Sequence, residues 1–341
     1  MTTALLFAAS LALIVVAAEL FTNAVEWAGF VLGLGAGATG SLLAALGTAL
    51  PETVVPVVAI ASRQPSSDAV AMGAIVGAPF LLLTLGMGVT GVAVLLRRRR
   101  PVLEADAGQL RRDLGAFAAG FALLALAVVL PLPARVVVAV ALLGIYAGYV
   151  IVTLREDRPT DAMPEPLHLL RWSSARAGSK GEQRPPRGGA VALQLVGAVA
   201  MLVLGADLFV RALDRTSTAL GVSALVLSLV LVPLATEFPE TFNSVLWVRS
   251  DDDRLALGNI AGATAFQACL PGALGVVFTP WRPGAAGLIN GTLTALTAAY
   301  TLVLLRDGRC QGWRLVFSAL PWVGYVVLVL VAGERLAPVH G

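Results

Sequence analysis

The chain has 341 residues, of which 57% are hydrophobic and only 13% are charged. Soluble globular domains carry about 25% charged residues, so this composition excludes a soluble domain and indicates an integral membrane protein. The net charge is +3, and the basic residues gather in segments between apolar stretches, which favours membrane topology and anionic-lipid contact over nucleic-acid binding.

Ten apolar stretches long enough to cross a bilayer follow one another along the chain. A spanning helix needs about 20 apolar residues, and several stretches exceed this, which indicates tilt, a break or an extension past the bilayer. The first stretch lacks the basic start of a signal peptide, so we expect it to be retained. The predicted spans are 4–27, 34–61, 68–95, 113–131, 134–154, 189–213, 220–248, 254–279, 284–305 and 313–332.

Residues 155–188 form the one long polar segment, and they divide five predicted spans from five. Because five is odd, the two groups must enter the membrane from opposite sides, an arrangement typical of secondary transporters with a substrate site near the midplane. We therefore expect an all-α membrane protein of ten transmembrane helices in two inverted five-helix repeats. Residues 1–154 and 189–341 are the predicted repeats, and 155–188 is predicted to be a flexible, basic cytoplasmic linker.

Basic residues predict the orientation of these spans. With ten spans, 18 of the 24 Lys and Arg residues fall on the side that carries the linker. The positive-inside rule makes that side cytoplasmic and places both termini outside. We expect a multi-pass protein of the plasma (inner) membrane.

The two predicted repeats share uncommon residues in the same order. Such residues recur too regularly for compositional bias, so the pattern indicates a duplication. The first block is Ala18-Glu19-Leu20-Phe21 followed by Thr48, Pro51, Glu52 and Thr53, and it returns 188 residues later as Ala206-Asp207-Leu208-Phe209 followed by Thr236, Pro239, Glu240 and Thr241. The second block runs from Asp68 to Gly77-Ala78 and returns 185 residues later from Asp253 to Gly262-Ala263.

Each repeat carries a proline-glutamate pair inside a predicted span. Proline has no N–H to donate and clashes with the carbonyl four residues earlier, so each proline frees one carbonyl oxygen. A threonine lies one helical turn before each glutamate, on the same face. The carbonyl, threonine and glutamate are those of Gly47, Thr48 and Glu52 in the first repeat and of Ala235, Thr236 and Glu240 in the second.

The second repeat adds a further carboxylate, Glu237, and close helix packing would bring the Gln267 amide towards it. A carboxylate in a membrane is costly and is usually functional. A set of oxygen ligands without a histidine or thiolate cluster suits a hard cation such as Ca²⁺. Carboxylates this close cannot all stay ionised without a cation, so cation and proton binding are expected to alternate. The competing interpretation, a helix kink whose carboxylate reaches the surface, is less favoured for two symmetric copies.

Other features have simpler interpretations. Asp251-Asp252-Asp253 is expected to be a solvated turn. Four acidic residues near span ends line an ion entry path or are solvated helix ends, and the sequence leaves both open. These residues are Glu19, Glu26, Asp207 and Asp214. Glycines at four-residue spacing favour close helix packing. They are Gly73, Gly77, Gly258 and Gly262.

These motifs resemble those of the calcium/cation antiporter superfamily, specifically its sodium/calcium exchanger family. Residues 47–52, Gly-Thr-Ala-Leu-Pro-Glu, are similar to the family signature Gly-Thr-Ser-Leu-Pro-Glu, and residues 235–240 resemble a degenerate second copy. Residues 258–263 are similar to the Gly-Asn-x-x-Gly-Ser that follows. The resemblance implies that Glu52 and Glu240 bind calcium and sodium at the membrane centre, with Thr48 and Thr236 as flanking ligands.

The chain also departs from the family pattern. Ala49 and Glu237 replace serines, and Leu82 and Gln267 stand where the family commonly has Asn and Asp. The first half has therefore lost oxygen ligands and the second has gained a carboxylate. Gln267 is similar to the glutamine of the cation/proton branch, so the resemblance supports calcium binding more firmly than sodium coupling.

The combined expectation is a secondary antiporter that exchanges calcium for sodium by alternating access, and not an enzyme. The alternatives are a proton-coupled exchanger of calcium or another divalent cation, a channel, and a non-transporting scaffold. No cofactor is expected, because Ca²⁺ is cargo and Na⁺ or H⁺ is the counter-ion. The expected partners are the transported cations and the lipid bilayer, without nucleic acid, and the oligomeric state stays open.

Overall fold

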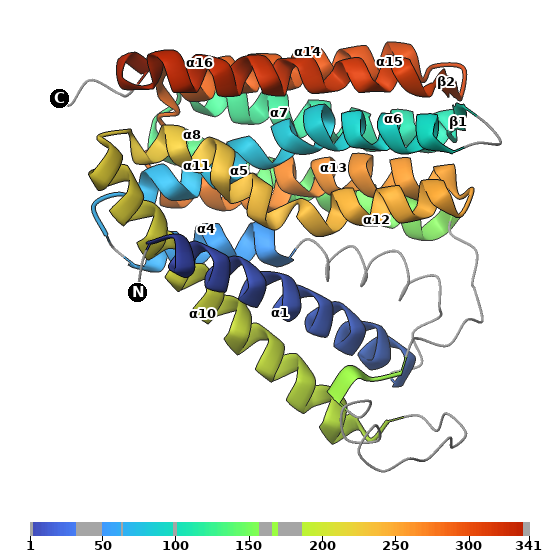
Figure 1. The fold of residues 1–341 in the computed structure, drawn as a ribbon, viewed down its shortest axis with the longest axis horizontal. Coiled ribbons are helices and arrows are strands. Elements are labelled where there is room, and N and C mark those ends of the chain that lie inside the picture. Colours follow the sequence, from blue (N-terminus) through green and yellow to red (C-terminus); the bar gives the residue numbers. More distant parts are fainter. Residues whose placement is uncertain are drawn as a thin grey trace.

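The computed structural model describes residues 3–31, 50–62, 64–97, 101–156, 166–169 and 186–336. These residues are mostly helical and form a bundle of long helices, from which one helix pair leans away at one end (Figure 1). The first half contains α1 (Thr3–Val31), α4 (Leu50–Ser62), α5 (Ser67–Leu81), the π-helix η2 (Leu82–Gly86), α6 (Met87–Leu96), α7 (Ala107–Ala127) and α8 (Leu132–Glu156). The second half contains α10 (Gly188–Leu220), α11 (Ala224–Thr236), α12 (Phe238–Arg249), α13 (Asp253–Phe278), α14 (Gly284–Leu304), α15 (Gly312–Val316), the 3₁₀ helix η3 (Phe317–Ala319) and α16 (Leu320–Leu336).

The described helices confirm a multi-pass membrane protein. Seven of them are long and apolar enough to cross a membrane, or eight if the bent pair α11–α12 is one span. The two other predicted spans correspond to α7, whose first turns carry three charged residues, and to α4, an apolar helix of 13 residues. The part of the predicted span 34–61 that precedes α4 lies outside the described residues.

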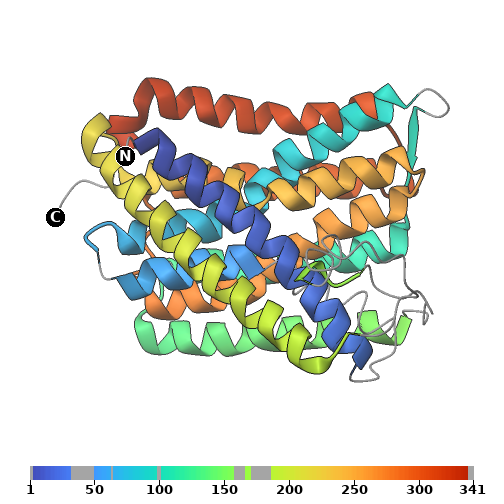
Figure 2. The same ribbon diagram turned by 60° about the horizontal axis from the view of Figure 1, so that its bottom comes forward.

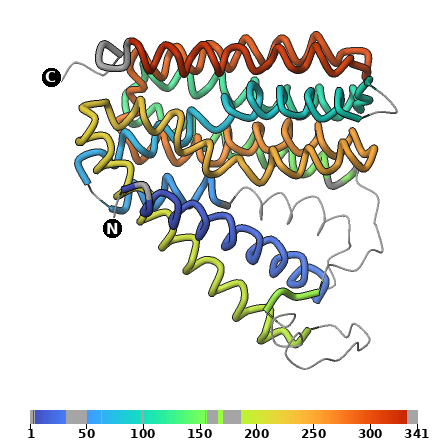
Figure 3. Tube along the Cα trace, viewed as in Figure 1, coloured from blue at the N-terminus to red at the C-terminus, as the bar shows by residue number. Residues whose placement is uncertain are grey.

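The leaning pair consists of α1 and α10, the first helices of the two halves. They run side by side in opposite directions, α1 in dark blue and α10 in yellow-green (Figures 2 and 3). Gly205 permits their close contact, because an added Cβ would lie 2.9 Å from Cγ1 of Ile14. Near the C-terminal end of α10, the Ser66 hydroxyl donates to Asp214 at 2.6 Å and so connects the α4–α5 turn to α10.

Two glycines bring α5 against α11, across the two halves of the chain. An added Cβ at Gly73 would lie 1.8 Å from the Ser228 hydroxyl oxygen, and one at Gly77 would lie 2.6 Å from the Leu229 carbonyl oxygen. Pro233, four residues after Leu229, has no N–H to bond this carbonyl. The predicted close packing is therefore confirmed for Gly73 and Gly77.

The equivalent glycines of α13 have different neighbours. An added Cβ at Gly258 would lie 2.6 Å from Nε2 of Gln109 on α7, and one at Gly262 would lie 3.2 Å from the Tyr149 hydroxyl on α8. In the described part of the chain, α13 thus packs on α7 and α8.

A buried ion pair holds together the end of the bundle opposite the start of α1. Arg97 donates to Asp253 at 2.6 and 3.2 Å, and the Glu104 backbone amide donates to the same carboxylate at 2.9 Å. The Asp253 side chain is only 2% exposed, so the expectation of a solvated turn is wrong for this residue. A buried carboxylate needs such partners.

Strands β1 (Val102–Glu104) and β2 (Arg309–Gln311) form an antiparallel ribbon at the same end. Leu103 pairs with Cys310 in its centre, and both side chains are buried. The ribbon joins the α6–α7 connection to the α14–α15 connection.

Four residues of the predicted linker, 166–169, lie against α1 and α10. The backbone amide of His168 donates to Asn23 Oδ1 at 3.1 Å, and that of Leu169 donates to Gln194 Oε1 at 2.8 Å. Leu167 is buried in a small cluster with Trp27 and Val191. This part of the linker is therefore docked between the two helices.

Candidate functional site

The chain bends by 45° between α11 and α12, in the middle of the predicted span 220–248. Pro239 lies in the first turn of α12, where a missing N–H costs least, and Glu237 is the residue between the helices. Ala235 belongs to the last turn of α11, where helix carbonyls lack intrahelical partners. The span is thus broken at the proline-glutamate pair of the second repeat. Carbonyls are freed there both because α11 ends and because Pro239 has no N–H.

Three carboxylates meet beside this bend. Glu52 comes from the first turn of α4, and Glu237 and Glu240 come from the α11–α12 junction. One oxygen from each lies within 4.8 Å of the other two, and the side chains are 0–3% exposed. Three negative charges this close and this far from water repel each other strongly. The arrangement suits a hard cation held by carboxylate oxygens.

Two neutral donors hold Glu237. The Thr236 hydroxyl lies 2.9 Å from its Oε1, and Nε2 of Gln267 on α13 lies 2.7 Å from its Oε2. The Gln267 carbonyl oxygen is buried and has no hydrogen-bond partner among the described residues. This oxygen can accept a proton donor or bind a cation.

Six of the eight predicted site residues lie in the described part of the chain, and two do not. Five of them converge at the α11–α12 bend or donate to a residue there, and Ala235 is buried in the adjacent helix turn. The five are Glu52, Thr236, Glu237, Glu240 and Gln267. The remaining two, Gly47 and Thr48, lie outside the described residues.

Two residues near the site were not predicted. Nδ2 of Asn259 lies 3.1 Å from the backbone carbonyl oxygen of Glu240, and the Ser244 hydroxyl lies 2.9 Å from the same oxygen. Asn259 belongs to the Gly-Asn motif, so its position in a repeated block was the available signal. Ser244 has no such signal in the sequence.

Three of the outer acidic residues have partners away from the three glutamates. Glu19 lies 3.2 Å from the His168 ring nitrogen, Asp207 pairs with Arg211 at 2.8 Å, and Asp214 accepts from Ser66. These contacts favour neither of the two interpretations, an ion entry path or solvated helix ends, so both stay open.

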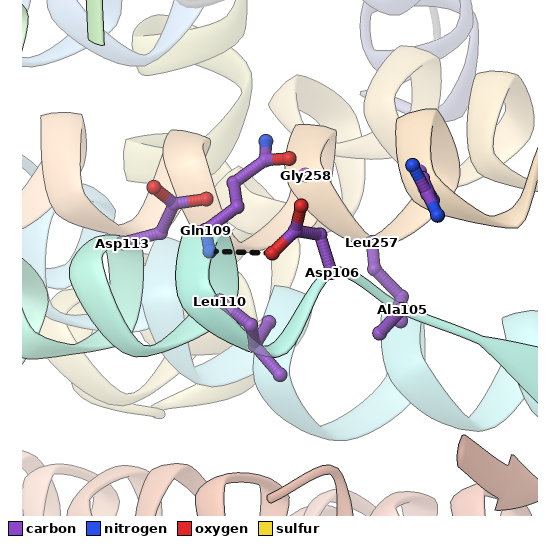
Figure 4. A pocket seen from close by; sticks show the side chains of 8 residues that line it. Ala105, Asp106, Gln109, Leu110, Asp113, Leu257 and Gly258 are labelled. Atoms are coloured by element: carbon purple, nitrogen blue, oxygen red, sulfur yellow. Dashed lines mark hydrogen bonds between the residues drawn. The ribbon is translucent and has the colours of Figure 1, made fainter. Parts of the chain in front are cut away.

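A separate pocket with about 170 Å³ of empty space lies between α7 and α13. Asp106, Asp113 and Arg254 line it, and Figure 4 shows the Asp106 carboxylate accepting from the Gln109 backbone. Asp113 is buried, with Arg112 Nε 3.6 Å away. Both signs of charge surround this pocket, and none of the three glutamates lines it.

Known proteins resemble this chain in both sequence and fold. The family described as sodium/calcium exchanger protein matches residues 2–155 and 190–331, which is most of the chain. The putative antiporter CaxA of Alkalimonas amylolytica is 28% identical over 140 residues, an alignment that spans 40% of this chain and 44% of that relative.

Solved structures of exchangers share the fold. The H⁺/Ca²⁺ exchanger CAX has a TM-score of 0.74 at 17% identity, and the match covers 98% of this chain and 84% of that one. Native YfkE gives 0.68 at 14% identity, covering 96% and 92%. The sodium-calcium exchanger NCX_Mj gives 0.59 at 15% identity, covering 96% and 97%. At these identities the likeness shows the fold alone. With both halves matched by the family model, the chain belongs to the sodium/calcium exchanger protein family, a family of antiporters and not of enzymes.

Proposed function

We propose that this protein exchanges Ca²⁺ for a counter-ion by alternating access around Glu52, Glu237 and Glu240. The observation that carries this proposal is the convergence of one carboxylate from the first half and two from the second, all buried and within 4.8 Å. A buried carboxylate in a membrane is energetically costly, so its presence there indicates a function such as ion binding. One oxygen from each carboxylate, with the Thr236 hydroxyl and the Gln267 carbonyl nearby, provides the all-oxygen ligand set that Ca²⁺ prefers.

Ten spans in two inverted repeats are part of this proposal. The opposite directions of α1 and α10 support inversion, because they begin the two halves (Figure 1). In the same view, α1 begins and α16 ends at one end of the bundle, which supports an even number of spans. The β1–β2 ribbon lies at the other end, with exposed Arg306 and Arg309. The positive-inside rule would place this basic end in the cytoplasm of a plasma (inner) membrane and both termini outside.

For the counter-ion, we propose protons, with sodium as the alternative. Both kinds of exchanger share this fold, so the choice depends on the residues of the site. Ala49 and Leu82 supply no side-chain oxygen, which leaves few ligands for several sodium ions. Glu237 adds a carboxylate that Ca²⁺ alone does not neutralise, because three carboxylates exceed its charge by one. A proton needs no coordination shell and can neutralise that remaining charge.

Calcium flux in proteoliposomes tests the function and the counter-ion together. We expect ⁴⁵Ca²⁺ uptake when a pH gradient is imposed without sodium, and no uptake in liposomes that carry Glu52→Gln. Uptake driven only by a sodium gradient would show that the counter-ion is sodium and not protons. Equal ⁴⁵Ca²⁺ flux with and without either gradient would contradict antiport and support a channel.

A further inference from the structure

Helix α13 holds the α11–α12 bend at two points. Asn259 donates to the backbone carbonyl of Glu240 at 3.1 Å, and Gln267 donates to the carboxylate of Glu237 at 2.7 Å. The two donors are about two helical turns apart, so they lie near the same face of α13. One helix therefore holds both carboxylate-bearing residues of the second half.

Ser244 strengthens the first of these contacts. Its hydroxyl oxygen lies 2.9 Å from the Glu240 carbonyl oxygen and 3.2 Å from that of Ala256 on α13, and the side chain is fully buried. Its single proton is shared between two acceptors on facing helices. Glu240 lies in the first turn of α12, where a helix has its fewest backbone hydrogen bonds, so these side-chain contacts determine where its backbone sits.

The duplicated positions of the first half do not carry these donors. At the duplicated positions, Pro56 corresponds to Ser244, Ala74 to Asn259, and Leu82 to Gln267. None of the three has a side chain that donates a hydrogen bond. Pro56 lies inside α4, four residues after Glu52, and so removes the N–H that would bond the Glu52 carbonyl. The side-chain donors that hold the Glu240 turn are therefore a feature of the second half that the duplication does not repeat.

We propose that Asn259 is a positioning residue that, with Ser244, fixes Glu240 on α13. Glu240 is then held in place on the second-half side of the cation site before the ion arrives. This rests on the proposed cation site. A ligand held in place before binding loses less freedom on binding, which raises affinity.

The first test separates affinity from turnover in the full chain in proteoliposomes. Asn259→Ala and Ser244→Ala should each raise the half-saturating Ca²⁺ concentration roughly tenfold, because a buried acceptor loses a donor, with little change in maximal flux. Ser244→Thr keeps the hydroxyl and should stay near wild type. The matched control is Thr301→Ala, which removes another fully buried hydroxyl that donates to a helix carbonyl, on α14. It should lower the thermal unfolding midpoint and leave half-saturation unchanged. An equal rise in the control would overturn the positioning role.

Calcium titration by calorimetry distinguishes this proposal from the proposed function. Normal binding by Glu240→Gln would refute the cation site itself. Loss of binding in Glu240→Gln together with normal binding in Asn259→Ala and Ser244→Ala would refute only the positioning role.

Discussion

The amide nitrogen of Gln267 lies 2.7 Å from the carboxylate of Glu237, 30 residues earlier in the chain. Both residues depart from the sodium/calcium exchanger signature, and the structure makes them partners. Hydrogen bonds to a charged acceptor are stronger than neutral ones. The second half of the site has thus gained a carboxylate together with a donor that holds it.

Glu52→Gln and Glu240→Gln should each abolish calcium transport. The amide keeps the size of the side chain but removes a negative charge from the proposed site. ⁴⁵Ca²⁺ flux measures the loss, and membrane insertion of each variant is the control. Near-normal flux in both would remove the central role of these residues.

Glu237→Ser restores the family residue and should change ion preference. The variant loses the third carboxylate and the acceptor of Gln267, so we expect weaker dependence of calcium flux on the pH gradient and a new response to sodium. Gln267→Leu, which keeps the carboxylate but removes its donor, is the comparison. If Glu237→Ser kept both the pH and the sodium dependence of the wild type, Glu237 would be a bystander.

Arg97→Ala should destabilise the protein severely. It removes the guanidinium that donates twice to the buried carboxylate of Asp253, and breaking a buried pair costs about 3–5 kcal/mol. The matched control is Arg306→Ala, because the Arg306–Asp307 pair is 73% and 79% exposed and such pairs contribute little. Thermal unfolding in detergent compares the two, and similar midpoints would show that the Arg97 pair is not structural.

Asp106 should contribute stability that disappears in acid. The backbone amides of Gln109 and Gly108 donate to this helix-capping carboxylate and hold its pKa below the usual value. A lowered pKa stabilises the fold above the unfolded-state pKa, about 3.9, and this contribution is lost as pH falls through the folded-state pKa.

Two variants test this cap. Asp106→Ala should cost about 1 kcal/mol at neutral pH, and Asp106→Asn should keep most of that stability without its loss in acid. Thermal unfolding from pH 7 to pH 3 measures both effects. If the stability of Asp106→Asn fell in acid as much as that of the wild type, other groups would cause the acid dependence.

Residues 166–169 should detach when their acceptor is removed. Gln194 accepts from the Leu169 amide and donates to the Leu20 carbonyl, so Gln194→Leu should accelerate hydrogen exchange in the peptide that contains Leu169. Gln194→Glu keeps an acceptor and should exchange more slowly than Gln194→Leu. Equal, slow exchange in both would mean that the burial of Leu167 and the His168–Asn23 bond hold the segment without Gln194.

The sequence by itself determined the membrane class, the duplication and the two proline-glutamate positions. Composition indicates a bilayer protein, and uncommon residues repeated in order mark Glu52 and Glu240 without any knowledge of contacts. The sequence also identified Glu237 and Gln267 as departures, since each stands where the family has a different residue. It did not determine which helices they join.

Only the tertiary structure decided which faces meet. Helices that are apolar on all sides carry no periodic signal that distinguishes a buried face from a lipid-facing one. The Gly-Asn motif singles out Asn259, but no sequence pattern predicts its contact with the Glu240 backbone or the burial of Asp253 beside Arg97. Both depend on the packing of segments far apart in the chain.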